Sequence, residues 1–592
     1  MKKFFNKDQF VTTFLISAVL AMIGALFVAG FGFDIFFQSL QRQILFISLL
    51  WFFLGTVFYL TISILSNRFV YLQTYLTVGL RFGLILRKIF LAVFFLFPLG
   101  LIFFVQFAEL TAHPVYQKYV EPVGAVLRKD GNGLFLVGFL IVWLFLVGSS
   151  FTLLRTARIG KILDGLPDFF YVILIIMIVT ITRVILINSI KTEPYSDFAL
   201  IQADAVRIAQ GTAPQNMYIA THVALIIIYG FLYKIFGVNL VVVKVFHLVN
   251  YLLAGVFTYY MGKEVIGSRF WGGMAGLFLV SWPSLAFYSN VLTPEHPFIL
   301  IECALLYAVS LFFKNREKNQ GKVDWKRDLL WFLVIGFLFG LLSLFRPFSE
   351  LFLVAFVITL FVYGKGLKNL VVNGAGIIVL LAVFWLFGSL PGRIAASYNN
   401  QFSNTRPCNF LVGVNFNTAG VYNPEDSSLC NKLQTHTPDK SEFTKTVIGL
   451  AIQRIRDGRD HILLFIGQKI SVLWASSIMI LFWAFQVPSE MGPNTIMMTI
   501  VERVNLIDFA VTFTATITCL IGVVIAFFKD VKPVIFFSLL TFFGFNFMET
   551  LFEVQTRYRT VMMPLIIFFF CWTLAKIGSF IGKHVGEETV VA

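Results

Sequence analysis

Charged side chains are scarce in this sequence. Only 13% of the 592 residues are Asp, Glu, Lys or Arg, whereas 58% are hydrophobic. Soluble domains carry roughly 25% charged residues, so the chain lacks the charge density of a water-exposed surface. Apolar runs long enough to cross a bilayer, about 20 residues each, recur along nearly the whole sequence. Together these features predict an integral membrane protein.

The signatures of several soluble enzyme classes are also missing. The sequence has no Gly-rich phosphate loop ending in Gly-Lys-Ser/Thr, no His-Glu-x-x-His and no Asp-x-Asp pair that would hold a metal and a nucleotide. ATP hydrolysis, zinc proteolysis and nucleotide-sugar chemistry therefore lose support. No cofactor is firmly predicted and no metal ligand is assigned, although a divalent cation is compatible with the sequence.

Cysteine is rare, with five residues in the chain. Cys303, Cys519 and Cys571 lie inside apolar runs, where a small buried side chain is expected. Cys408 and Cys430 share the one long polar segment. If that segment is outside the cytosol, a disulfide between them is a plausible outcome, and two free thiols remain the alternative.

The net charge of +15 raises the question of a nucleic-acid partner. A nucleic-acid-binding protein would present a basic face on a soluble domain. Here Lys and Arg concentrate in short segments between apolar runs, a pattern that orients spans with basic loops toward the cytoplasm. The charge therefore indicates membrane topology, and no nucleic-acid partner is predicted.

The apolar runs predict an all-α polytopic membrane protein with about fourteen transmembrane helices. The expected spans are 10–32, 44–66, 88–107, 133–154, 168–190, 240–262, 270–288, 295–313, 328–345, 349–364, 369–389, 507–528, 533–550 and 559–578. Two further apolar stretches, 219–236 and 462–486, are interpreted as helices lying at or dipping into the interface. Counting either as a single span would place basic loops such as 314–327 or Lys529 and Lys532 outside.

This topology divides the chain into four parts. Residues 1–160 form an N-terminal four-span unit without an assigned role, and 161–390 form a membrane core whose first outer loop is 191–239. Residues 391–460 form one long outer loop, and 461–592 form the C-terminal membrane part. Within the long loop, apolar residues from Ser441 to Arg456 recur at helical spacing and predict an amphipathic surface helix.

Ionisable residues gather where several spans reach the predicted outer face. Charges near or within membrane helices are costly and tend to mark function or pairing, although most isolated examples simply make an outer turn polar. Convergence from four separate turns favours a site that combines carboxylates with cations. These candidates are Asp197, Asp204, Lys244, Glu295, Arg346, Glu350, Glu553, Arg557 and Arg559.

The order of the motifs around these residues resembles the GT-C glycosyltransferases, in particular the group of protein O-mannosyltransferases and lipid A aminoarabinose transferases. The resemblance covers about residues 168–580. It is carried by Ser196-Asp197-Phe198 with Ala205 and Ala209-Gln210-Gly211, by Ile228 to Gly237, by Ser289 to Glu295, by Arg346-Pro347, and by Glu553 to Arg559 with Pro564. One departure is Phe198, which stands where several members carry a second acidic residue.

The resemblance implies a GT-C-like core with extracytoplasmic juxtamembrane helices, and an inverting hexosyl- or pentosyltransferase. A sugar would move from a polyprenyl-phosphate donor to a glycan, lipid or protein hydroxyl. Asp197 would be the general base, with Asp204, Glu295, Glu350 and Glu553 as supporting residues. Cations would bind the donor phosphate, because a leaving phosphate gains negative charge. The candidates for that role are Lys244, Arg346, Arg557 and Arg559.

Two other functional classes remain open. A secondary transporter or flippase of a lipid-linked or small substrate would place its site near the bilayer midplane on broken helices, and no paired broken helices are evident in the sequence. A polysaccharide polymerase or ligase would also transfer sugars, but on a different fold. The high Phe content and the lack of eukaryotic targeting signals favour a bacterial plasma membrane, with the active site extracytoplasmic.

Overall fold

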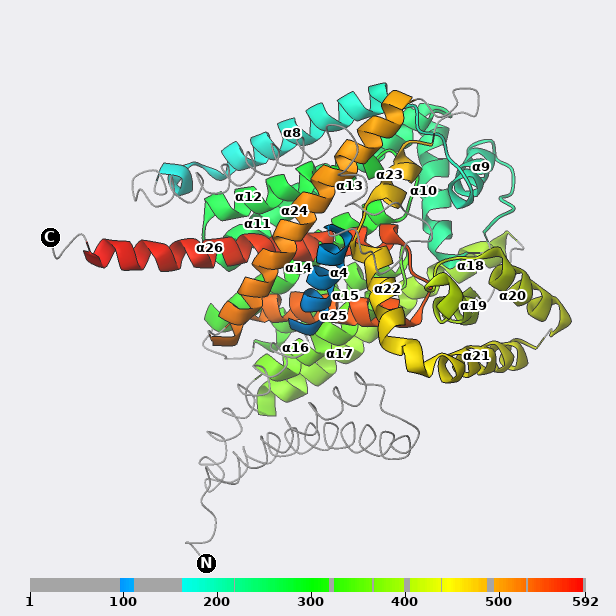
Figure 1. Ribbon diagram of the computed structural model, residues 1–592. Coiled ribbons are helices and arrows are strands. Elements are labelled where there is room, and N and C mark those ends of the chain that lie inside the picture. The colour runs from blue at the N-terminus through cyan, green and yellow to red at the C-terminus, as the bar shows by residue number, and fades with distance from the viewer. Residues whose placement is uncertain are drawn as a thin grey trace, which may run out of the picture.

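The computed structural model describes residues 96–110, 162–217, 219–318, 324–364, 367–398, 405–437, 439–486, 495–528 and 531–588 (Figure 1). Within these ranges every regular element is a helix, which confirms the all-α fold class. Seven helices are long and apolar enough to cross a membrane, or eight if one bent pair counts as a single span. The protein is therefore a multi-pass membrane protein, while the total of fourteen spans stays a prediction.

Each span predicted after residue 160 coincides with helical structure. The unbroken helices at these positions are α8 (Asp168–Ser189), α11 (Leu240–Ile266), α14 (Glu295–Lys318), α15 (Trp325–Ser343), α16 (Ser349–Tyr363), α17 (Leu367–Gly388), α24 (Thr495–Phe528), α25 (Pro533–Leu551) and α26 (Met563–Glu588). Of these, α15 and α16 are not among the seven candidate spans. The predicted span 88–107 overlaps α4 (Leu96–Leu110). The predicted spans 10–32, 44–66 and 133–154 lie outside the described residues.

Two apolar stretches are broken into pairs of helices, which the sequence did not indicate. The stretch 270–288 folds as α12 (Arg269–Ser281) and α13 (Pro283–Tyr288), because Pro283 has no N–H for the helical ladder and Trp282 is extended. The interfacial stretch 462–486 folds as α22 (Ile462–Trp474) and α23 (Ile478–Ala484), bent by 40°. Helices α13 and α23 pack against each other.

The elements around the predicted outer loops gather on one side of the bundle, opposite the C-terminal end of α26 (Figure 1). They include α9 (Asp197–Ala209), which packs on α10 (Ala220–Phe236), and α18 (Leu390–Ser397). A 3-10 helix, η7 (Thr556–Met562), joins α25 to α26.

A small lobe projects from the same side. It consists of α19 (Thr405–Gly413), η4 (Phe416–Thr418), α20 (Pro424–His436) and α21 (Lys440–Asp457). The predicted amphipathic helix is α21, which buries Phe443, Val447 and Ala451. A disulfide joins Cys408 to Cys430, with Cα atoms 6.0 Å apart. Both cysteines belong to the small apolar core of this lobe.

An ion pair adds to this core. Arg454 donates to both oxygens of Asp426, at 3.0 and 2.5 Å. Burial alone would raise the pKa of Asp426, but the hydrogen bonds from Arg454 and from the amides of Asn415 and Asn423 hold it below its ordinary value. The carboxylate therefore stays ionised and keeps α20 attached to α21.

Removing the disulfide should loosen this lobe. The double variant Cys408→Ser/Cys430→Ser is expected to lose roughly 2–4 kcal/mol of lobe stability, because the unfolded segment is no longer constrained. Hydrogen exchange across residues 405–461 would measure the loss. The control is Cys303→Ser, since Cys303 is a free buried thiol outside the lobe. Equal protection of the lobe in both variants would contradict the expected clamp.

Candidate functional site

Four turns of the chain meet at the lobe side of the bundle. Glu295 begins α14 and forms an ion pair with Arg346, which follows α15. Thr293 donates a second hydrogen bond to Glu295, and the Arg346 guanidinium lies 5.2 Å from the ring centre of Tyr558. Glu295 is fully buried. The ion pair with Arg346 and the hydrogen bond from Thr293 compensate its charge, which would otherwise be costly to bury. The predicted convergence of Glu295, Arg346 and the Glu553–Arg559 turn is therefore present in the structure.

Arg557 occupies an aromatic box at this convergence. Its guanidinium carbon lies 5.2 Å from the ring centre of Phe198, 5.5 Å from that of Trp483 and 5.6 Å from that of Tyr558. The residue is only 8% exposed, and its Nε is buried without a hydrogen bond. Among the described residues it forms no ion pair with a carboxylate. Cation–π contacts hold the guanidinium in place and leave its charge available to an anion.

Asp197 lies at the start of α9 and is half-buried. The preceding residue, Ser196, has a φ of 53°, a conformation that residues other than Gly seldom adopt. This turn ends the extended segment after α8 and directs Asp197 toward the turn that carries Glu553 and Arg557, with which it interacts electrostatically. Within the described part of the chain no hydrogen bond to the Asp197 carboxylate is found, so it is not held in a structural contact.

Glu553 is the second carboxylate beside Arg557. Burial raises its pKa above the ordinary value, the Asp197 charge raises it further, and Gln555 and Arg557 act in the opposite direction. Gln555 donates to Glu553 at 2.5 Å, while the backbone N–H of Glu553 donates to the carbonyl of Asn409 at 2.9 Å. Glu553 therefore links the cation-bearing turn to the lobe. Its carboxyl group holds a proton more readily than that of an exposed Glu, because its pKa is raised.

Asp204 is placed differently. It is fully buried and accepts hydrogen bonds from the backbone N–H groups of Gln215 and Asn216, at 2.9 and 2.5 Å, and from Arg207 at 3.0 Å. These contacts fold the end of the first outer loop back onto α9. Asp204 is thus a structural anchor, as the loop would unfold locally without it.

Three of the four predicted phosphate-binding cations, Lys244, Arg346 and Arg559, are committed to backbone carbonyls or to a carboxylate. Lys244 is buried in α11, and its Nζ donates to the carbonyl of Thr192 at 3.2 Å. Thr192 in turn donates to the carbonyl of Ala484 in α23. Lys244 therefore braces the start of the first outer loop. Glu350 lies in the first turn of α16, beyond the Arg346-Pro347 turn.

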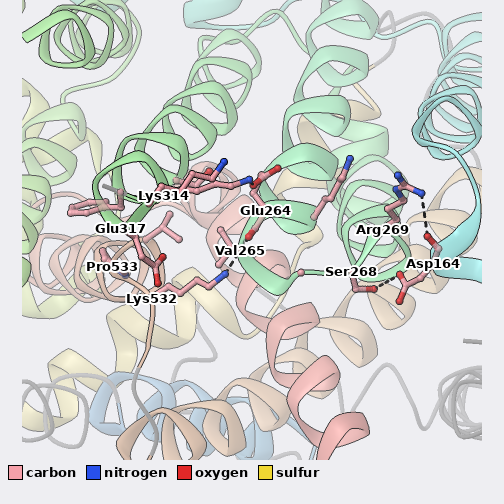
Figure 2. A pocket seen from close by; sticks show the side chains of 15 residues that line it. Asp164, Glu264, Val265, Ser268, Arg269, Lys314, Glu317, Lys532 and Pro533 are labelled. Carbon is pink, nitrogen blue, oxygen red and sulfur yellow. Dashed lines mark hydrogen bonds and ion pairs between the residues drawn. The ribbon is translucent and has the colours of Figure 1, made fainter. Parts of the chain in front are cut away.

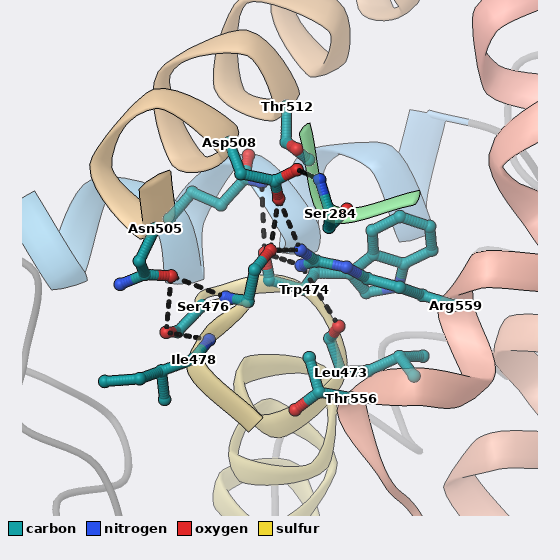
Figure 3. Close-up of polar contacts among 12 residues, drawn as sticks. Ser284, Leu473, Trp474, Ser476, Ile478, Asn505, Asp508, Thr512, Thr556 and Arg559 are labelled. Carbon is teal, nitrogen blue, oxygen red and sulfur yellow. Dashed lines mark hydrogen bonds and ion pairs between the residues drawn. The ribbon is translucent and has the colours of Figure 1, made fainter. Parts of the chain in front are cut away.

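Arg559 belongs to a buried clamp that Figure 3 shows in detail. It forms an ion pair with Asp508 of α24 at 2.9 Å and donates to the carbonyl of Trp474 at 3.0 Å and to the hydroxyl of Ser477. Asp508 also accepts from the backbone N–H of Ser284, at 2.8 Å. The clamp joins η7 to both broken helices. The phosphate-binding role expected of Arg559 does not fit this arrangement, because its terminal nitrogens are already engaged.

Sequence reasoning missed several residues around the site. Lys469 is buried in α22 and donates to the carbonyls of Gly413 and Phe552, at 2.5 and 2.6 Å, which fixes the lobe to the turn before Glu553. Asp508 and Lys469 are charges inside apolar stretches, a signal that could have identified them. Trp483 carries no such signal.

His222, near the start of α10, was also missed. Its backbone N–H donates to the carbonyl of Ile219 at 3.0 Å, but its imidazole makes no hydrogen bond with the residues that the structure describes. Burial and the neighbouring charges of Arg346 and Arg557 lower its pKa to about 3. The imidazole is therefore neutral at physiological pH and lies close to both arginines. In the described ranges no cluster of three or more His, Cys, Asp or Glu side chains is placed to hold a metal, and a divalent cation remains an untested expectation.

The chain was compared with curated proteins, with solved structures and with models of protein families. A comparison with curated proteins gives no match. Among solved structures, the chain is similar to the crystal structure of ArnT from Cupriavidus metallidurans bound to undecaprenyl phosphate. The match covers 69% of this chain and 78% of that chain at 12% sequence identity, with a TM-score of 0.32. At this score the structural likeness carries no argument by itself.

A family model gives the more specific result. The model of dolichyl-phosphate-mannose-protein mannosyltransferases matches residues 223–387. This range includes Lys244, Glu295, Arg346 and Glu350, whereas Asp197 and Arg557 lie outside it. The resemblance predicted from the sequence motifs is therefore confirmed by a match, over residues 223–387, to a GT-C mannosyltransferase family.

Proposed function

We propose that the protein is a glycosyltransferase that moves a sugar from a polyprenyl-phosphate donor to an acceptor hydroxyl at the extracytoplasmic face of the membrane. The observation that carries this proposal is Arg557, a buried cation without a carboxylate partner among the described residues, which interacts electrostatically with Asp197. A buried guanidinium is costly unless an anion accompanies it. The phosphate of the donor supplies that anion.

The proposed reaction uses the two charges separately. Asp197 accepts the proton of the acceptor hydroxyl as its oxygen attacks the anomeric carbon. The bond between that carbon and the phosphate oxygen breaks on the opposite side, so the configuration inverts. The leaving polyprenyl phosphate keeps the bonding electron pair, and Arg557 stabilises the added charge. Arg346 forms an ion pair with Glu295 and orients that carboxylate beside the same site.

The acceptor is a hydroxyl on a glycan, a lipid or a protein, and the site geometry does not favour one of these. The sugar is a hexose or a pentose. A bacterial plasma membrane is the proposed location. A secondary transporter remains the second candidate function, because two broken helices, α12–α13 and α22–α23, pack together through α13 and α23.

Donor consumption distinguishes these functions. Purified protein in nanodiscs would be incubated with a panel of polyprenyl-phosphate sugars and a cell-envelope extract as the source of acceptor. The glycosyltransferase proposal expects one donor of the panel to be converted to free polyprenyl phosphate. A transporter would bind or move the lipid and leave every donor intact, and that outcome would overturn the proposal.

The side of the membrane can be tested with single cysteines. Cysteine introduced at Ser427, in the lobe, is expected to react with an impermeant thiol reagent in intact cells, and cysteine at Gln320 is not. Gln320 lies outside the described residues and is placed by the positive-inside pattern alone. Wild type serves as the background, because three of its cysteines are buried and two are bridged. The reverse labelling pattern would contradict an extracytoplasmic site.

A further inference from the structure

A pocket lined by several charged side chains lies where α11 and α14 end, away from the residues of the candidate site. Figure 2 shows the side chains that line it. Its volume is about 660 Å³, and it is bounded by the end of α11, the start of α12, the end of α14 and the start of α25. Nineteen residues of α11 separate Lys244 from Lys263, and nineteen of α14 separate Glu295 from Lys314. At 1.5 Å per residue this is about 28 Å, which is close to the thickness of the hydrocarbon core. The pocket therefore lies at the other membrane surface.

Cations outnumber carboxylates in this pocket. Five basic side chains line it, against the three carboxylates of Asp164, Glu264 and Glu317. The basic residues are Lys263, Arg269, Lys314, Lys318 and Lys532. Asp168, just outside the lining, pairs with Lys263 at 2.5 Å and with Arg269 at 3.0 Å. Even with Asp168 included, the cations remain in excess.

The excess charge can be assigned to particular residues. Lys314 is paired with Glu264. Lys532 instead donates to the backbone carbonyl of Glu264, at 3.2 Å, so its charge has no carboxylate partner in that contact. Lys318 is exposed and forms no ion pair with the residues that the structure describes. Lys318 and Lys532 are thus the two lining cations without an ion pair among the described residues. The carboxylates of Asp164 and Glu317 stand against them, so the net excess, with Asp168 counted, is one positive charge.

The backbone adds to this potential. Helix α12 begins at Arg269 and α25 begins at Pro533, so the N-terminal ends of two helices border the pocket. The N-terminal end of a helix carries partial positive charge and favours phosphate. At α12 this position is already taken, because Asp164 accepts from the backbone N–H of Phe270 and Ser268 accepts from that of Trp271. The start of α25 is therefore the helix end that adds to the positive potential of the pocket. Val265, Phe313 and Val534 form an apolar part of the wall. The pocket thus combines an anion-binding floor with a surface suited to acyl chains.

We propose that this pocket binds the phosphodiester headgroup of an anionic phospholipid from the leaflet opposite the candidate site. The headgroup lies against Lys318, Lys532 and the start of α25, and its acyl chains leave along the apolar wall. The volume is within the roughly 300–1,000 Å³ typical of small-molecule sites. A lipid is favoured over a soluble anion because the pocket opens where membrane-crossing helices end and has an apolar side. The site shares no residue with the candidate functional site.

Lipid binding to purified full-length protein tests this proposal. Native mass spectrometry would compare the retention of phosphatidylglycerol and phosphatidylcholine added at equal concentration. Wild type is expected to retain phosphatidylglycerol about tenfold better, and Lys318→Gln/Lys532→Gln to lose that preference. Lys318→Arg/Lys532→Arg should keep it, because the charge remains. The control Lys326→Gln/Lys445→Gln also removes two exposed charges, but outside the pocket, and should behave as wild type.

Three results would overturn the proposal. The first is equal retention of the two lipids by wild type. The second is an unchanged preference in Lys318→Gln/Lys532→Gln, or an equal loss in the control. The third is displacement of phosphatidylglycerol by inorganic phosphate at the same concentration, which would identify the occupant as a soluble anion.

Discussion

Replacing Arg557 by Ala is expected to weaken binding of a polyprenyl-phosphate sugar by roughly a hundredfold or more, since a charged hydrogen-bonding partner of a largely dry phosphate is lost. The side chain is 8% exposed and is held by Phe198, Trp483 and Tyr558 rather than by a carboxylate. Its removal therefore breaks no ion pair of the described residues, although Asp197 and Glu553 lose a neighbouring positive charge. The loss should appear in the donor dissociation constant, measured with a fluorescent donor in nanodiscs.

The substitution Arg557→Lys separates charge from shape. Lysine keeps the positive charge but loses the planar fork that binds two phosphate oxygens and stacks on aromatic rings. Affinity should recover only in part. The matched control is Arg459→Ala, because Arg459 is 49% exposed and lies between α21 and α22, away from the aromatic box. If Arg557→Ala bound the donor normally, the phosphate site would have to move to Arg346 or Lys244.

Replacing Asp197 by Asn should slow sugar transfer by about 10²–10⁴-fold, which is the usual contribution of a general base. Asparagine keeps the shape of the side chain but cannot accept the proton of the acceptor. Because the Asp197 carboxylate accepts no hydrogen bond within the described part of the chain, the variant should fold and still bind the donor. Turnover would be measured as release of polyprenyl phosphate from the donor identified in the panel.

Two matched variants make this result specific. Asp460→Asn carries the same change at a carboxylate that is 78% exposed, and it should turn over normally. Asp204→Asn removes the negative charge that accepts hydrogen bonds from Gln215, Asn216 and Arg207. It should therefore lower the thermal stability of the first outer loop, and the transfer rate per folded molecule should change little. Normal turnover by Asp197→Asn would reassign the base, with Glu553 as the next candidate.

The sequence predicted the membrane helices well, because span length and hydrophobicity are local properties. The spans at 168–190, 240–262 and 533–550 differ from α8, α11 and α25 by only a few residues at the ends. The breaks at Trp282 and near Ser476 were not predicted. The first follows from Pro283, which the hydrophobic pattern conceals, and the second is held by Asn505, whose side chain accepts from Ser476 and Ser477.

The sequence predicted which residues meet at the candidate site better than it predicted what each of them does there. Charges that end spans on one face could be grouped from their positions alone, and Glu295 and Arg346 do pair. The partners of Arg559 and Lys244 could not be predicted, because Asp508 is 51 residues from Arg559, and the Thr192 carbonyl is 52 residues from Lys244. Such long-range contacts depend on how the helices pack. The box around Arg557 likewise joins α9, α23 and η7.

The central claim is that Arg557 holds the donor phosphate while Asp197 takes the proton. One paired measurement tests it: the donor dissociation constant and the single-turnover rate at saturating donor, determined on wild type, Arg557→Ala and Asp197→Asn from the same preparations. The account predicts weak binding in Arg557→Ala, and normal binding with a rate at least about a hundredfold lower in Asp197→Asn. Wild-type binding and wild-type rates in both variants would contradict it.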